Sequence, residues 1–139
     1  MIARALVTLS AAIVLGLGAL HLLYTFWGRR FHPRDAALEA RMREVAPVLT
    51  RDMTMWNAWI GFNVSHSLGA LLYGLVYGYL ALAAPTFLFQ SWFLRLVGLI
   101  LLASYLVTGK IYWFRVPYFG VLAAFACYAG GLAAGLAHF

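Results

Sequence analysis

One short stretch of the sequence carries most of the side chains that could bind a ligand or move a proton. Asn63, His66 and Ser67 are separated by three and four residues, so they share one face if the stretch is helical. An imidazole can transfer protons, and the neighbouring amide and hydroxyl can form hydrogen bonds. Two interpretations stay open for this face: hydrogen bonding between helices, or a site for a ligand, a cofactor or a proton.

A second set of polar side chains lies nearer the start of the chain. His21, Tyr24 and Thr25 repeat the spacing of three and four residues. Two inward histidines on neighbouring helices are the minimum requirement for a bis-histidine haem b. Residue counting places His66 about 6 Å deeper than His21, which disfavours that arrangement. No cofactor is therefore predicted, and haem b is kept as an alternative.

Tyr73 and Tyr77 lie farther along the chain than His66, where they would line a cavity or reach for the membrane surface. The predicted ligand-binding residues are His21, Tyr24, Asn63, His66, Ser67 and Tyr73. No catalytic residue and no metal site is predicted, because the sequence has no H-E-x-x-H spacing, no paired-carboxylate motif and no nucleophile elbow.

These polar residues stand in a chain that is otherwise strongly apolar. Hydrophobic residues make up 65% of its 139 residues and charged residues only 10%, whereas soluble domains have about 25% charged residues. A soluble protein of this size buries too little surface to hide so many apolar side chains. The composition excludes an ordinary globular domain and a disordered chain, and it indicates an integral membrane protein.

Four apolar runs are long enough to cross about 30 Å of hydrocarbon. They cover residues 2–27, 56–83, 89–113 and 118–139. Only helices and closed barrels satisfy their backbone in hydrocarbon, and unbroken runs of this length are not barrel strands. Pro85 and Pro117 mark two of the connections as tight turns. We predict an all-α fold, with one domain over residues 1–139 that forms a four-transmembrane-helix bundle.

The remaining connection, residues 28–55, is predicted to contain a short amphipathic helix at the membrane interface. His32 to Asp35 would form its start, with Pro33 at the first helical position. Leu38 and Met42 recur at helical spacing, and Pro47 would interrupt or kink the helix. An amphipathic helix of this kind lies in the plane of the interface.

The charges predict an orientation. Eight of the ten basic residues lie in residues 28–55 or beside the last connection, and the net charge is +6. Basic residues accumulate on the cytoplasmic side, so both termini would face outward. Charge at the ends of spans favours anionic lipid headgroups over nucleic acid as partners. The predicted headgroup-binding residues are Arg29, Arg30, Arg34, Lys110 and Arg115.

Small residues suggest close helix packing. Gly131 and Gly135 form a G-x-x-x-G pattern, and Gly69, Gly74 and Gly78 lie in the second span. Such residues let helices of one chain approach closely, or they form a self-association face. We expect the partners to be membrane lipids and either a homo-oligomer or a larger complex of the bacterial inner membrane.

Three short segments carry a resemblance: Gly61-Phe62-Asn63, Ser67-Leu68-Gly69 and Tyr112-Trp113-Phe114. With these segments, the chain resembles a family of small, uncharacterised bacterial four-helix integral membrane proteins. The resemblance implies the four-helix fold and brings no activity and no functional residue. The first hypothesis is a non-enzymatic accessory or oligomer-forming subunit that acts by helix packing. The alternative is a lipid-modifying enzyme, or a protein that binds haem or another lipophilic ligand, with a pocket around His21 and His66.

Overall fold

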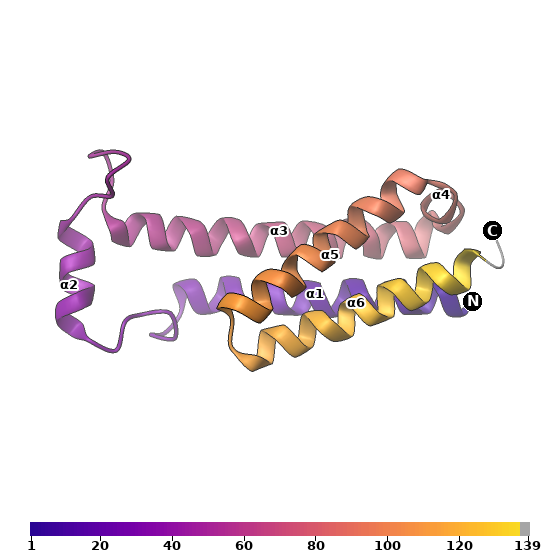
Figure 1. Ribbon diagram of the computed structural model, residues 1–139, viewed down its shortest axis with the longest axis horizontal. Coiled ribbons are helices and arrows are strands. Elements are labelled where there is room, and N and C mark those ends of the chain that lie inside the picture. Colours follow the sequence, from indigo (N-terminus) through magenta and orange to yellow (C-terminus); the bar gives the residue numbers. More distant parts are fainter. Residues whose placement is uncertain (137–139) are drawn as a thin grey trace. The chain divides into compact units, whose positions relative to one another are not determined.

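The computed structural model describes residues 1–136, and within that range the chain is all-helical, with six helices and no strands. The helices are α1 (Ile2–Phe26), α2 (Ala36–Glu44), α3 (Met55–Ala83), α4 (Pro85–Gln90), α5 (Trp92–Tyr112) and α6 (Arg115–Leu136) (Figure 1). Four of them, α1, α3, α5 and α6, are long and apolar enough to cross a membrane. The predicted helical class and the four candidate spans are confirmed.

The described ends of these four helices lie within three residues of the predicted ends. Two prolines explain the main differences. Pro117 was expected to mark a turn, but it lies in the first turn of α6. Amides of the first turn donate no hydrogen bond within the helix, so a proline there removes none. Pro85 begins the unpredicted six-residue helix α4 for the same reason. The last predicted residues, 137–139, lie outside the described range.

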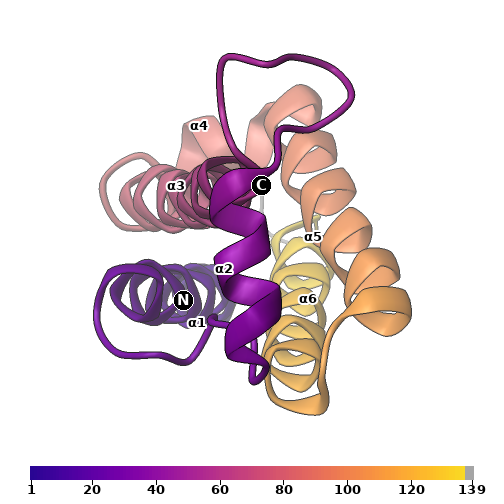
Figure 2. The same cartoon turned by 90° about the vertical axis from the view of Figure 1, so that its left-hand side faces the viewer.

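The short helix α2 starts later than predicted. Its N-cap is Asp35, whose carboxylate accepts a hydrogen bond of 2.9 Å from the amide of Ala37. A capping carboxylate satisfies an amide that the helix itself leaves unpaired. The expected start at Pro33 is therefore wrong, and the helix ends at Glu44, before Pro47. It runs crosswise to the adjoining parts of α1 and α3 (Figures 1 and 2).

The chain divides into two compact units. The first comprises Met1–Leu17 together with the chain from Ala70 onward, and the second comprises Gly18–Gly69. The predicted single domain stays a prediction. Each unit contains part of α1 and part of α3, because the division falls within both helices.

In the first unit, glycines allow the helices to approach closely. A Cβ atom added at Gly74 would lie 2.6 Å from the Cβ of Leu15 in α1. One added at Gly131 would lie 2.8 Å from Cγ2 of Val7, and one at Gly135 would lie 2.5 Å from the ring of Phe89. Ordinary carbon contacts are about 3.5–4.0 Å. At these glycines, the predicted packing within one chain is confirmed.

The core of the first unit is aromatic. Tyr73, Tyr77 and Tyr128 are all buried, with the rings of Tyr73 and Tyr77 stacked at 4.6 Å and Tyr128 edge-on to Tyr77 at 5.5 Å. The hydroxyl of Tyr77 donates a 2.7 Å hydrogen bond to the carbonyl of Leu94. A buried tyrosine usually finds such a partner for its hydroxyl. These tyrosines hold α3, α5 and α6 together.

Candidate functional site

The most concentrated polar site lies in the second unit, between the end of α1 and the start of α3. Nε2 of His21 donates a 2.9 Å hydrogen bond to Oδ1 of Asn63. The rings of His21 and His66 meet edge-to-face, with their centroids 5.2 Å apart. The structure thus brings together three of the predicted residues from two helices. We call His21, Asn63 and His66 the polar cluster.

Asn63 uses both ends of its side chain. Its Oδ1 accepts from His21, and its Nδ2 donates to the carbonyl of Trp59 at 2.8 Å. The side chain is almost completely buried, so an unmade bond would be costly there. Ser67, also predicted, is fully buried and donates 2.8 Å to the carbonyl of Asn63. The bond between His21 and Asn63 joins α1 to α3, while the bonds of Asn63 to Trp59 and of Ser67 to Asn63 lie within α3.

A phenylalanine from the connection completes the cluster. The ring of Phe31 lies 4.5 Å from that of His21, and the indole of Trp59 donates a 3.0 Å hydrogen bond to the carbonyl of Phe31. Phe31 was not among the predicted site residues, because it lies in an irregular segment where no periodicity indicates the direction of a side chain. This ring also forms one wall of a groove beside the polar cluster.

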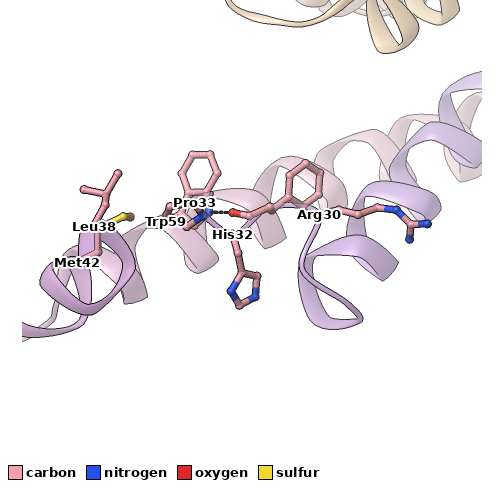
Figure 3. A pocket seen from close by; sticks show the side chains of 7 residues that line it. Arg30, His32, Pro33, Leu38, Met42 and Trp59 are labelled. Carbon is pink, nitrogen blue, oxygen red and sulfur yellow. Dashed lines mark hydrogen bonds between the residues drawn. The ribbon is translucent and has the colours of Figure 1, made fainter. Parts of the chain in front are cut away.

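That groove is shallow and has a volume of about 440 Å³ (Figure 3). Its lining is mostly apolar, with five apolar or aromatic side chains and two basic ones. These residues are Phe31, Pro33, Leu38, Met42, Trp59, Arg30 and His32. Leu38 and Met42 come from α2 and both line the groove. Their separation of four residues puts them on the same face of that helix.

The basic side chains of the groove have partners within the second unit. The guanidinium of Arg30 lies 4.0 Å from the centre of the Tyr24 ring, and it points away from Leu38 and Met42 (Figure 3). Nδ1 of His32 lies 3.0 Å from Oε2 of Glu39. Both basic side chains that line the groove thus have partners within the second unit, and the rest of its lining is apolar or aromatic.

Glu39 of α2 links that helix to His32 in the preceding segment. Besides His32, it binds Arg43 four residues farther along α2, with Nη2 of Arg43 2.9 Å from Oε1 of Glu39. The hydrogen bond from His32, followed by that from Arg43, lowers the pKa of Glu39 below its ordinary value. Arg43 also lies 4.1 Å above the ring of Trp56, which fixes α2 to the start of α3.

The other predicted site residues lie elsewhere. Tyr24 packs with Arg30. Tyr73 belongs to the first unit, where its hydroxyl lies 3.3 Å from Oγ of Ser10. The five predicted headgroup-binding residues all have exposed side chains, namely Arg29, Arg30, Arg34, Lys110 and Arg115.

The cluster does not fit a haem as it stands. The two histidine rings contact each other, so no planar macrocycle fits between them, and Nε2 of His21 already bonds to Asn63. Within residues 1–136, no group of three or more His, Cys, Asp or Glu side chains could hold a metal ion.

No protein-family model matches the sequence, and comparisons with curated proteins and with solved structures give no match either. Function is therefore inferred from the geometry of this chain.

Proposed function

We propose that this chain is a multi-pass integral membrane protein that acts as a non-catalytic accessory or oligomer-forming subunit. Its four long apolar helices provide the spans. Their outer faces carry large exposed apolar side chains, such as Phe62, Leu72 and Ile100. In a bundle such faces contact lipid or the helices of a partner.

The observation that carries this proposal is that both ends of the buried Asn63 side chain form hydrogen bonds. Its oxygen bonds to α1 and its nitrogen to the backbone of α3. A polar side chain buried among apolar helices stabilises their association when its bonds are made. This supports the interhelical interpretation of the polar cluster over that of a reactive group, since the amide is already committed to the fold.

We further propose that α2 lies on the cytoplasmic surface of a bacterial inner membrane, with both termini outside. Leu38 and Met42 face the groove, while Arg41 is paired with Glu44 at an exposed position. This division into an apolar and a charged side is typical of interfacial helices. The exposed arginines beside it would bind anionic headgroups.

The assembly is tested by extracting the tagged chain from its native membrane in a mild detergent. Light scattering combined with absorbance gives the protein mass of the particle. We expect a mass above that of one chain, either a multiple of it or that of a larger complex. An unrelated four-span monomer extracted in parallel is the control. A particle that contains one copy of this chain and no other polypeptide contradicts the proposed role.

A second candidate function is favoured by one contact. Phe31 packs on His21 and also lines the groove, so a lipophilic ligand in the groove would adjoin the polar cluster. On this alternative, the chain binds or modifies a lipid there, and Met42→Trp fills the groove. A lipid that co-purifies with the wild-type chain and is lost in this variant supports the alternative. Equal retention by both proteins opposes it, and a Soret band on adding haem would revive haem as the ligand.

A further inference from the structure

Arg95 lies in a second groove, in the first unit and far along the sequence from the polar cluster. This groove has a volume of about 290 Å³ and is lined by Trp92, Arg95, Leu96 and Leu99 of α5 and by Leu132 of α6. Its walls are otherwise apolar, so Arg95 supplies the only charge. We call it the Arg95 groove.

The guanidinium of Arg95 lacks a partner at one buried atom. Among the described residues, only two buried side-chain nitrogen or oxygen atoms have no hydrogen bond, Nε of Arg95 and Oγ1 of Thr8. A buried donor without an acceptor is costly, and most so when it is charged. A ligand with an acceptor oxygen would satisfy Nε.

The described residues of the first unit include no Asp or Glu. All four acidic residues of the chain, Asp35, Glu39, Glu44 and Asp52, belong to the second unit. Arg4, another cation of the first unit, is used differently, since its Nη2 donates 2.8 Å to the carbonyl of Leu82 near the end of α3. No acidic side chain among the described residues of this unit neutralises Arg95, which leaves its guanidinium open to an anionic ligand.

The position of Arg95 limits the kind of anion. It is the fourth residue of α5, about 4.5 Å along the axis from Trp92 at the helix start. Trp92 is largely exposed, as is common for tryptophan at the membrane surface. An arginine at this depth reaches the headgroup layer, while leucines below it contact acyl chains.

The helix pair around the groove is held in place. The hydroxyl of Tyr128 in α6 donates to the carbonyl of Arg95 at 3.2 Å, and Gly98 makes room for the Tyr128 ring. The backbone of Arg95 is therefore fixed, and only its side chain has to adjust to a ligand. Such preorganisation lowers the cost of binding.

We propose that the Arg95 groove binds one anionic phospholipid, with the phosphate on the guanidinium and an acyl chain along Leu96, Leu99 and Leu132. Arginine forms charge-assisted hydrogen bonds to phosphate oxygens, and these bonds would include the unpaired Nε. This site is independent of the proposed subunit role and of the polar cluster.

Native mass spectrometry of the whole chain in micelles with equal phosphatidylglycerol and phosphatidylcholine tests the site. We expect the wild-type chain to retain the anionic lipid in preference, and Arg95→Gln to lower that preference roughly fivefold. Arg41→Gln removes one charge in the second unit, where Arg41 is already paired with Glu44, and should change the preference little. An equal loss in both variants, or none in Arg95→Gln, would overturn the proposal.

Two further variants keep the test decisive if Arg95→Gln folds poorly. Arg95→Lys retains the charge and should keep most of the preference. Leu132→Trp retains Arg95 but fills the groove, so it should lose the bound lipid. Full retention of the anionic lipid by Leu132→Trp would place the lipid elsewhere and contradict the groove.

Discussion

The carboxylate of Glu39 shows how single residues order the connection between α1 and α3. It lies within 4 Å of basic atoms of Arg29, His32 and Arg43. Because its pKa is lowered, the stability that the ionised group contributes is fully present above the ordinary carboxyl pKa. That contribution is lost only when the pH falls through the lowered pKa. At neutral pH these contacts should therefore be intact.

The hydrogen bond from His32 contributes most to the lowered pKa of Glu39. In His32→Ala the pKa of Glu39 should rise toward its ordinary value, because the largest stabilising hydrogen bond to the carboxylate is lost. Carbon NMR of the labelled carboxyl group, followed over an acid titration, measures this change. Arg41→Ala is the control, since Arg41 pairs with Glu44 instead. An unchanged titration in His32→Ala would show that the hydrogen bond does not form.

At this scale the sequence predicted some contacts and missed others. Helical spacing was sufficient to place Asn63, His66 and Ser67 on one face, because periodicity fixes direction within a helix. It could not show that Tyr24 pairs with Arg30, or that Phe31 packs on His21. Both contacts depend on the path of the irregular segment after α1, which is set by tertiary bonds.

Gly74 allows α1 and α3 to approach closely in the first unit. Gly74 of α3 lies against Ala11 and Leu15 of α1, whereas Gly61 of the same helix has no non-local atom within 4 Å of an added Cβ. The two positions thus differ in their surroundings and share their helix. They form a matched pair for testing the packing.

Gly74→Ala should destabilise the protein by about 1–3 kcal/mol, because the new methyl overlaps Leu15 and the helices must separate. Gly61→Ala should be neutral or slightly stabilising, because alanine favours the helix. Reversible unfolding in mixed micelles, followed by circular dichroism, gives both free energies. Equal effects of the two substitutions would contradict the close approach of α1 and α3.

The elements themselves were largely predictable. Runs of apolar residues locate the four long helices, because hydrocarbon leaves no alternative for the backbone. The ends of the helices were less predictable, because local capping hydrogen bonds and first-turn prolines determine them. Asp35 and Pro117 are the examples. The short helix α4 begins at Pro85, and its six residues show no periodic pattern from which it could be predicted.

At the scale of the whole molecule, the distribution of charge predicts how the chain sits in the membrane. Val48, between α2 and α3, and Thr86, in α4, are both exposed. Four spans place these two positions on opposite sides. In a Cys127→Ala background, a membrane-impermeant maleimide applied to spheroplasts should label Thr86→Cys and not Val48→Cys.

After the membrane is permeabilised, both cysteines should react, which controls for accessibility. The expected pattern follows from the tendency of basic residues to lie on the cytoplasmic side, which would put residues 28–55 there. Labelling of Val48→Cys in intact spheroplasts, with Thr86→Cys protected, would reverse the orientation. Labelling of both before permeabilisation would contradict the four-span arrangement itself.

The central claim is that the polar cluster joins helices, and a double-mutant cycle tests it most directly. His21→Ala, Asn63→Ala and the double variant are compared by unfolding in mixed micelles, with Ser65→Ala replacing Asn63→Ala in a control cycle. In the described part of the chain, the hydroxyl of Ser65 donates to the carbonyl of Phe62 within its own helix. We predict a coupling of about 1 kcal/mol between His21 and Asn63, as for hydrogen bonds between membrane helices. Additivity within about 0.3 kcal/mol would show that these two residues do not join α1 to α3.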